Sequence, residues 1–198
     1  STEHVERQRL VDEDRYQKGK LLGRGANGSV YAAILSNGSS IAMKVMNLDG
    51  DSVRQQMIEI TREMGIIKKL QHPHLLTYYG CKEDWANSQV LIFTELVTGG
   101  SLGSMVRSLQ DPLQEETCRH FFAQIVSGLA YMHSKGIVHR DLKGDNILFD
   151  SASGQVKIAD FGTAKSLGPG GQAASTIIGT PYFMAPEQIA GIETDDNA

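Results

Sequence analysis

The patterning of apolar residues changes near residue 97, and this change constrains the fold more than any other feature of the sequence. Between residues 16 and 97, short apolar runs alternate with turn residues, which is typical of strands. From residue 98 onward the apolar residues recur at helical spacing, most clearly between Gln114 and Ser134. The sequence therefore predicts an α+β chain of two lobes, the first rich in strands and the second mainly helical.

One predicted helix interrupts the strand-rich part. Its apolar residues follow one another at intervals of four and three, which places them on one helix face. Asp51 or Ser52 can cap the first turn, and Pro73 is expected to end the helix because proline disfavours helix in the residue before it. The residues of this stripe are Val53, Met57, Ile60, Met64 and Ile67.

Composition excludes several classes of protein. Nineteen basic against 23 acidic side chains give a net charge of −4, which disfavours nucleic-acid partners. The longest apolar run, Val30 to Leu35, is far shorter than the roughly 20 residues of a membrane span. The two cysteines, Cys81 and Cys118, predict no disulfide framework and indicate a cytoplasmic location. Residues 1–15 carry eight charges and are expected to form a solvated, charged flank.

Three glycines lie between two predicted strands in the pattern Gly23-x-Gly25-x-x-Gly28. Glycine has no Cβ, so the backbone N–H groups of such a loop can approach phosphates closely. The pattern alone is equally compatible with an ordinary glycine-rich hairpin. A Rossmann dinucleotide site is disfavoured, because it requires a helix after the loop whereas Val30 begins a predicted strand.

A lysine, Lys44, lies within the apolar strand from Ile41 to Met46. Taken alone, it is most simply an edge-strand lysine whose amine reaches solvent. Glu63 follows 19 residues later, beside the apolar stripe of the predicted helix. If that helix packs on the sheet, the carboxylate can reach the ammonium group and hold it toward a polyphosphate.

Acidic, basic and amide side chains are concentrated between His139 and Asn146. Asp141 is suited to accept a hydroxyl proton, and Lys143 to neutralise a phosphoryl group during transfer. Asn146 offers a side-chain oxygen of the kind that Mg²⁺ prefers. A polar surface turn is the alternative, and it is disfavoured because the apolar run 147–149 follows at once and ties the turn to a core.

A second metal-ligand candidate, Asp160, follows the strand-like stretch 155–159 and precedes Phe161 and Gly162. A carboxylate in this position suits a metal ligand on a movable segment. With the glycine loop, Lys44, Glu63, the 139–146 segment and Ala185-Pro186-Glu187, these pieces occur in the order typical of protein kinases. The chain therefore resembles the protein kinase family over about residues 16–191.

The resemblance implies a bilobal kinase fold. Residues 16–97 would form the N-lobe and hinge, a small antiparallel sheet with one helix. Residues 98–198 would form part of the helical C-lobe, with the catalytic and activation loops. The chain stops eleven residues after Glu187, whereas kinase domains continue through further helices, so it is expected to be a C-terminally truncated fragment of a longer protein. The apolar face of the 114–134 helix would then be partly uncovered.

The resemblance also implies catalytic roles. Lys44 would contact the α- and β-phosphates of ATP and pair with Glu63. Asp141 would orient the substrate hydroxyl and accept its proton, with Lys143 beside it. Much of the catalysis would come from positioning and charge neutralisation.

The cofactors implied are ATP and Mg²⁺, with Asn146 and Asp160 as metal ligands. The adenine would lie against a hinge, contacted by backbone groups of Glu95 and Val97. One departure from the family is Asn27 at the loop tip, where an aromatic residue is frequent. The residues implied to contact the nucleotide are Gly23, Arg24, Gly25, Ala26, Asn27, Gly28, Val30, Ala42, Lys44, Thr94, Glu95, Val97 and Leu148.

Substrate class and regulation also follow from the resemblance. Lys143 two residues after Asp141, together with Thr180, is similar to serine/threonine kinases. The stretches 99–102 and 179–187 are most similar to mitogen-activated protein kinase kinase kinases and their sterile-kinase-like relatives. The implied substrates are Ser/Thr hydroxyls of proteins, a downstream kinase being one candidate, in a cascade of that type.

Arg140 would pair with a phosphate on the later loop, with Thr176 as the first candidate and Ser175 as the second. The sequence does not indicate the oligomeric state. The alternative function is a non-catalytic nucleotide-binding or scaffold module.

Overall fold

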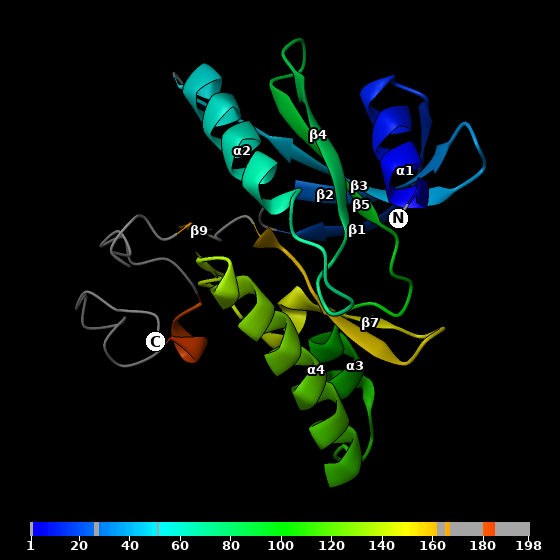
Figure 1. Cartoon of the computed structure of the whole chain (residues 1–198), viewed down its shortest axis with the longest axis vertical. Helices are drawn as coiled ribbons and strands as arrows, with labels where there is room; N and C mark the ends of the chain where they lie inside the picture. The colour runs from blue at the N-terminus through cyan, green and yellow to red at the C-terminus, as the bar shows by residue number, and fades with distance from the viewer. Residues whose placement is uncertain (1, 26–27, 51, 162–164, 167–179, 185–198) are drawn as a thin grey trace. The chain divides into compact units, whose positions relative to one another are not determined.

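The computed structural model describes residues 2–25, 28–50, 52–161, 165–166 and 180–184 (Figure 1). Its contacts divide the chain into two compact units. The first comprises Ser1–Gln71 and Thr77–Leu96, and the second comprises His72–Leu76 and Val97–Ala198. Within the described residues, none of the helices combines the length and apolar character that crossing a membrane requires.

The first unit contains one five-stranded antiparallel sheet, so the predicted α+β class is confirmed. The strands are ordered β1-β2-β3-β5-β4, and a tight turn joins β2 to β3, in which Gly38 follows Asn37 and has the positive φ (+84°) that Asn-Gly hairpin turns require. The elements of this unit are α1 (Thr2–Asp12), β1 (Tyr16–Gly25), β2 (Gly28–Leu35), β3 (Ser40–Asn47), α2 (Val53–Ile67), β4 (Tyr78–Asp84) and β5 (Gln89–Glu95).

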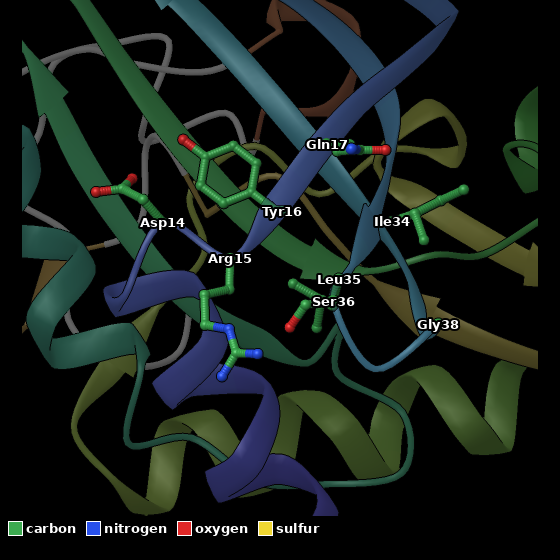
Figure 2. Close-up of a pocket in the computed structure, with 8 residues that line it drawn as sticks. All are labelled: Asp14, Arg15, Tyr16, Gln17, Ile34, Leu35, Ser36 and Gly38. Atoms are coloured by element: carbon green, nitrogen blue, oxygen red, sulfur yellow. The ribbon is translucent and has the colours of Figure 1, made fainter.

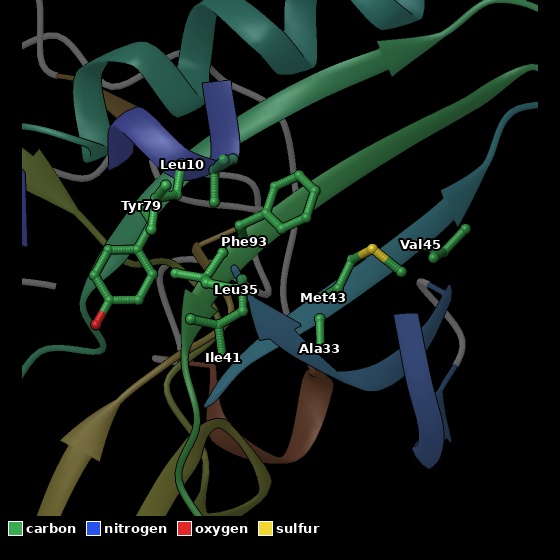
Figure 3. Packing of buried hydrophobic residues seen from close by; sticks show 9 residues of the cluster. Leu10, Ala33, Leu35, Ile41, Met43, Val45, Tyr79 and Phe93 are labelled. Carbon is green, nitrogen blue, oxygen red and sulfur yellow. The ribbon is translucent and has the colours of Figure 1, made fainter. Parts of the chain in front are cut away.

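The two faces of this sheet carry different side chains. Residues in register across antiparallel strands share a face, and Lys44 is in register with both Val30 and Ile92. The opposite face is apolar and carries a cluster of buried residues (Figure 3). Its core consists of Ala33, Leu35, Ile41, Met43, Val45, Tyr79 and Phe93, with Leu10 and Val11 packed on them.

Helix α1 packs on this apolar face, so the expectation of a merely solvated flank is wrong. Leu10 and Val11 are only 2% and 0% exposed. The Arg7 guanidinium donates a hydrogen bond to the Tyr79 hydroxyl at 2.8 Å, and Lys82 Nζ lies 2.6 Å from a carboxylate oxygen of Asp14. Two adjacent apolar residues among eight charges are too few to show a helical period in the sequence.

Helix α2 is the predicted helix of the first unit. It buries Met57, Met64 and Ile67 of the predicted stripe and contacts β4 and β5. The Thr61 hydroxyl donates to Glu83 Oε1 of β4 at 3.1 Å. The helix ends at Ile67 and not at Pro73, because the chain turns at once through a Leu70 N–H to Ile67 O bond.

The second unit combines helices with short antiparallel pairs, β6 with β9 and β7 with β8. The segment His72–Leu76 belongs to it: Leu76 N–H donates to Ile158 O at 2.8 Å, and Ile158 N–H donates to His74 O at 2.9 Å. The elements are α3 (Leu102–Ser108), α4 (Glu115–Ser134), β6 (Ile137–Val138), η1 (Gly144–Asn146), β7 (Ile147–Asp150), β8 (Gln155–Ile158), β9 (Lys165–Ser166) and η3 (Pro181–Phe183).

Helix α4 confirms the long helix that the sequence predicts, but its apolar face is unevenly covered. Phe121 and Met132 are buried, whereas Phe122 is 66% exposed and Val126 is also exposed. This matches the expectation that part of the apolar face lies uncovered.

Candidate functional site

Asp141 is the centre of a hydrogen-bonded cluster in the second unit. Its Oδ2 accepts hydrogen bonds from Lys143 Nζ at 2.8 Å and from Asn146 Nδ2 at 2.9 Å. Its Oδ1 accepts one from the Thr180 hydroxyl at 2.6 Å. The structure thus brings together three residues that the sequence analysis selected for chemistry. Thr180, which the sequence analysis used only to infer substrate class, is the fourth member.

These contacts decide the charge of Asp141. Burial raises the pKa of this carboxyl, but hydrogen bonds from Lys143, Thr180 and Asn146 lower it, and the net pKa lies below the usual value. Lys143 Nζ also donates to Thr180 Oγ1 at 2.7 Å, so the threonine hydroxyl receives one bond and donates its proton to Asp141. The carboxylate is therefore ionised at neutral pH and held in place on both oxygens.

The residues present fit a magnesium ion. Asn146 is buried, and its amide nitrogen donates both to Asp141 O and to Asp141 Oδ2, which leaves the amide oxygen as the group for a cation. Ala159 N–H donates to Asn146 O at 2.8 Å, so Asp160 follows directly on a residue bonded to Asn146. An amide oxygen and a carboxylate are hard ligands of the type that Mg²⁺ prefers.

No group of three or more His, Cys, Asp or Glu side chains in the described part of the chain could hold a metal ion. Two protein ligands suit an ion that takes its remaining ligands from phosphates and water. The neighbouring backbone is unusual as well, because Arg140 and Asp160 adopt left-handed φ angles of 66° and 58°. Such conformations cost about 1–3 kcal/mol and concentrate at functional sites.

The predicted nucleotide residues of the first unit lie on one face of its sheet. Val30 is in register with Lys44, and Ala42 is in register with Thr94, so all four share the face opposite to the α1 core. Strand β3 is central in the sheet, which rules out the edge-strand interpretation of Lys44. Gly28 has φ +124°, and a Cβ there would lie 2.2 Å from Val45 O, so this position requires glycine.

The family model described as "Protein kinase domain" matches residues 16–198. The chain belongs to the protein kinase family. It is 40% identical over 182 residues to human mitogen-activated protein kinase kinase kinase 3, covering 89% of this chain and 29% of that protein.

Two further relatives show the same level of similarity. Mitogen-activated protein kinase kinase kinase 5 of Arabidopsis thaliana is 40% identical over 92% of this chain and 25% of its own length. Mitogen-activated protein kinase kinase kinase 15 of mouse is 40% identical over 90% of this chain and 13% of its own length. The chain therefore spans less than a third of the length of these curated relatives.

Several residues predicted for this kinase site lie outside the described part of the structure. These are Ala26 and Asn27 of the glycine loop and the candidate phosphosites Ser175 and Thr176. Glu63 lies in α2, but its side chain is not described, so its pair with Lys44 stays a prediction.

The other residues predicted to contact the nucleotide lie in strands or shortly after one. Gly23, Arg24 and Gly25 are the exposed last residues of β1, paired with the start of β2. Glu95 ends β5; its N–H donates to Thr77 O at 2.9 Å, and its carbonyl accepts a hydrogen bond from the Thr94 hydroxyl at 3.2 Å. Leu148 lies in β7 and is bridged to Ser101. Val97 is the first residue of the longer part of the second unit, Val97–Ala198.

A separate pocket of the first unit involves none of the predicted kinase residues. It has a volume of about 550 Å³ and lies where α1 joins β1, beside the β2–β3 turn (Figure 2). Its lining residues are Asp14, Arg15, Tyr16, Gln17, Ile34, Leu35, Ser36 and Gly38.

His139 supports the backbone of the Asp141 cluster. It is 2% exposed, and its Nε2 lies 2.8 Å from Ala159 O, which can only accept, so Nε2 carries the proton. Nδ1 then accepts the Asp141 N–H at 3.3 Å, and the ring contacts Phe161 with centroids 5.7 Å apart. The sequence analysis did not select His139 for chemistry; its place directly before Arg140-Asp141 was the available signal.

The stability of the kinase should fall in mild acid because of His139. Burial lowers the pKa of His139 from its ordinary value of 6.5, although the bond to Ala159 O opposes this shift. Below that pH the unfolded chain binds a proton that the folded chain excludes, so the free energy of unfolding falls by up to about 1.4 kcal/mol per pH unit. Urea unfolding between pH 7.5 and pH 5.5 measures this slope.

The variant His139→Gln provides the comparison, because His4 and His72 also have lowered pKa values and contribute in both proteins, burial being the largest cause for each. The variant should lose part of the acid sensitivity. Equal slopes in the wild type and the variant would contradict the neutral state assigned to His139.

Proposed function

We propose that this kinase transfers the γ-phosphoryl group of Mg·ATP to serine or threonine hydroxyls of protein substrates. The observation that carries the proposal is the Asp141 carboxylate held by Lys143, Thr180 and Asn146. An ionised, partly buried carboxylate can orient an attacking hydroxyl and accept its proton during transfer. A lysine bonded to it lies where the phosphoryl charge develops.

The other predicted site residues would bind the nucleotide and the metal ion. Lys44, on the face of the sheet opposite to the α1 core, would bind the nucleotide phosphates, and backbone groups of Glu95 and Val97 would bind the adenine edge. Asn146 and Asp160 would hold Mg²⁺. When bound, the ion neutralises charge on the phosphate oxygens. Lys143 and Thr180 are the residues in which the sequence is similar to serine/threonine kinases. The hydrogen bonds of Thr180 with both Lys143 and Asp141 place this pair beside the proposed base and support that substrate class.

The cellular role is proposed from the relatives. Three of them are named mitogen-activated protein kinase kinase kinases, so a kinase of the next tier in such a cascade is the substrate class that we propose. Both cysteines are free, which supports a reducing, cytoplasmic compartment.

Regulation by phosphorylation is proposed for the loop after Asp160. Arg140, beside Asp141 in a left-handed conformation, would pair with a phosphate on Thr176, or on Ser175 as the second choice. Thr176→Ala should then lower the activity of the phosphorylated protein by at least about 10-fold, the size of one or more charge-assisted hydrogen bonds. Assays before and after phosphatase treatment check this, with Ser175→Ala beside it; no difference from the wild type would exclude Thr176.

The function itself is tested by phosphate transfer from Mg·ATP to a generic basic protein, followed by phosphoamino-acid analysis. Phosphoserine and phosphothreonine are the expected products. Phosphotyrosine would contradict the substrate class. Binding of Mg·ATP without transfer would favour the alternative, a nucleotide-binding scaffold.

A further inference from the structure

The segment Gly99–Arg107, here called the bracing segment, runs along the chain from Gly144 to Phe149 (Figure 1). Phe149 N–H donates to Gly100 O at 2.9 Å, and Ser101 forms a bridge with Leu148. A Cβ at Gly99 would lie 2.2 Å from Phe149 O. The backbone of residues 99–101, just after the predicted hinge, therefore lies directly against the backbone of residues 148–149.

Helix α3 continues this contact through a pair of glycines. A Cβ on Gly103 would lie 2.8 Å from Asp145 Oδ1 and 2.9 Å from the carbonyl carbon of Gly144. A Cβ on Gly144 would lie 3.0 Å from Gly103 Cα. Neither glycine has a positive φ angle, so space and not backbone conformation requires glycine at both positions.

The contact ends in an ion pair. Arg107 Nη2, in the last turn of α3, lies 2.6 Å from Asp145 Oδ1. The helix is anchored at its other end by Ser101, whose hydroxyl accepts the Ser104 N–H at 3.1 Å. Both charged side chains are exposed, and exposed ion pairs add little to the stability of a fold. The effect of this pair is therefore expected on local position.

We propose that the bracing segment positions the η1 turn and, through it, Lys143 and Asn146. The turn begins directly after Lys143 and ends at Asn146, whose N–H donates to Lys143 O at 2.9 Å. A displacement of Gly144 and Asp145 therefore moves the amine bonded to Asp141 and the amide proposed as a metal ligand. Gly103 and Arg107 are positioning residues, and their effect on phosphoryl transfer rests on the proposed function.

Gly103→Ala tests the proposal in the intact protein. Alanine is the better helix former, so the change would stabilise a helix with free space around it. Here it must push the η1 turn away, and a misplacement of about 1 Å can lower kcat about 100-fold. We expect kcat to fall about 10- to 100-fold while the KM for ATP changes little. Hydrogen exchange at the Asn146 and Phe149 amides should become faster.

Gly65→Ala is the matched control. Gly65 also lies in a helix, α2, but a Cβ there would meet nothing within 4 Å. This variant should keep the wild-type kcat and the wild-type exchange at Asn146 and Phe149. If Gly103→Ala behaves like Gly65→Ala in both measurements, the proposal is overturned.

The ion pair gives a second test that does not depend on packing. Arg107→Asp and Asp145→Arg should each lower kcat about 2- to 5-fold, and the double variant should restore most of it. Additive losses in the double variant would overturn the role of the pair. If the wild type transfers no phosphate, the proposed function fails, and the exchange rates at Asn146 and Phe149 alone decide whether the bracing segment holds the turn.

Discussion

Replacing Asp141 with asparagine is expected to lower the rate of phosphoryl transfer by about 10²- to 10⁴-fold. Asparagine has nearly the same shape and can still accept hydrogen bonds through its oxygen. It carries no charge and accepts no proton, so the substrate hydroxyl loses its base. It also removes the anion that Lys143 and Thr180 bind through their donated hydrogens.

Steady-state kinetics with Mg·ATP and a protein substrate measure this loss. The affinity for ATP should change little, since no contact of Asp141 with the nucleotide is proposed. Asp111→Asn, at an exposed loop position of the same unit, is the control and should keep the wild-type rate. A variant at Asp141 with more than half of the wild-type rate would remove this residue from the mechanism.

Replacing Lys44 with methionine is expected to lower kcat about 10²- to 10³-fold, the usual effect of removing one preorganised donor to developing charge. Methionine preserves the length and the apolar stem of lysine, so a half-buried position in the central strand β3 can accept it. The loss then reports on the ammonium group and not on packing.

The control is Lys20→Met, at an exposed position of β1 in the same sheet. It removes the same charge but should leave transfer unchanged. Thermal unfolding of both variants shows whether the fold is retained. If Lys44→Met keeps the normal rate of phosphoryl transfer in a stable protein, Lys44 has only a structural role in the sheet. The glycine loop must then bind the phosphates without it.

Local patterns predicted much of the fold. The short apolar runs that form β2 and β3 placed Val30 and Lys44 as strand residues, and the spacing of methionines and isoleucines predicted α2. These signals are local because strand and helix periods repeat within a few residues. The motif order then identified the kinase family, which the family comparison confirmed.

The assignment of faces and partners needed the tertiary structure. The Leu10-Val11 pair carries no readable period, and only the packing against Tyr79 and Phe93 shows that α1 belongs to the core. Likewise, no short-range pattern joins Thr180 to Asp141, although their side chains lie 2.6 Å apart.

Short stretches of the sequence thus determine which chemical groups are present: an acid, a lysine and an amide within six residues, and glycines where a phosphate can approach. The positions of these groups relative to one another do not follow from short stretches of sequence. Contacts between residues about 40 apart form only when burial of apolar surface outweighs the loss of chain entropy. The pairing of Gly103 with Gly144 is of this second kind. In the sequence, each glycine alone is an ordinary residue that disfavours helices and strands. Only the folded chain shows that both glycines leave space for one backbone to lie against another.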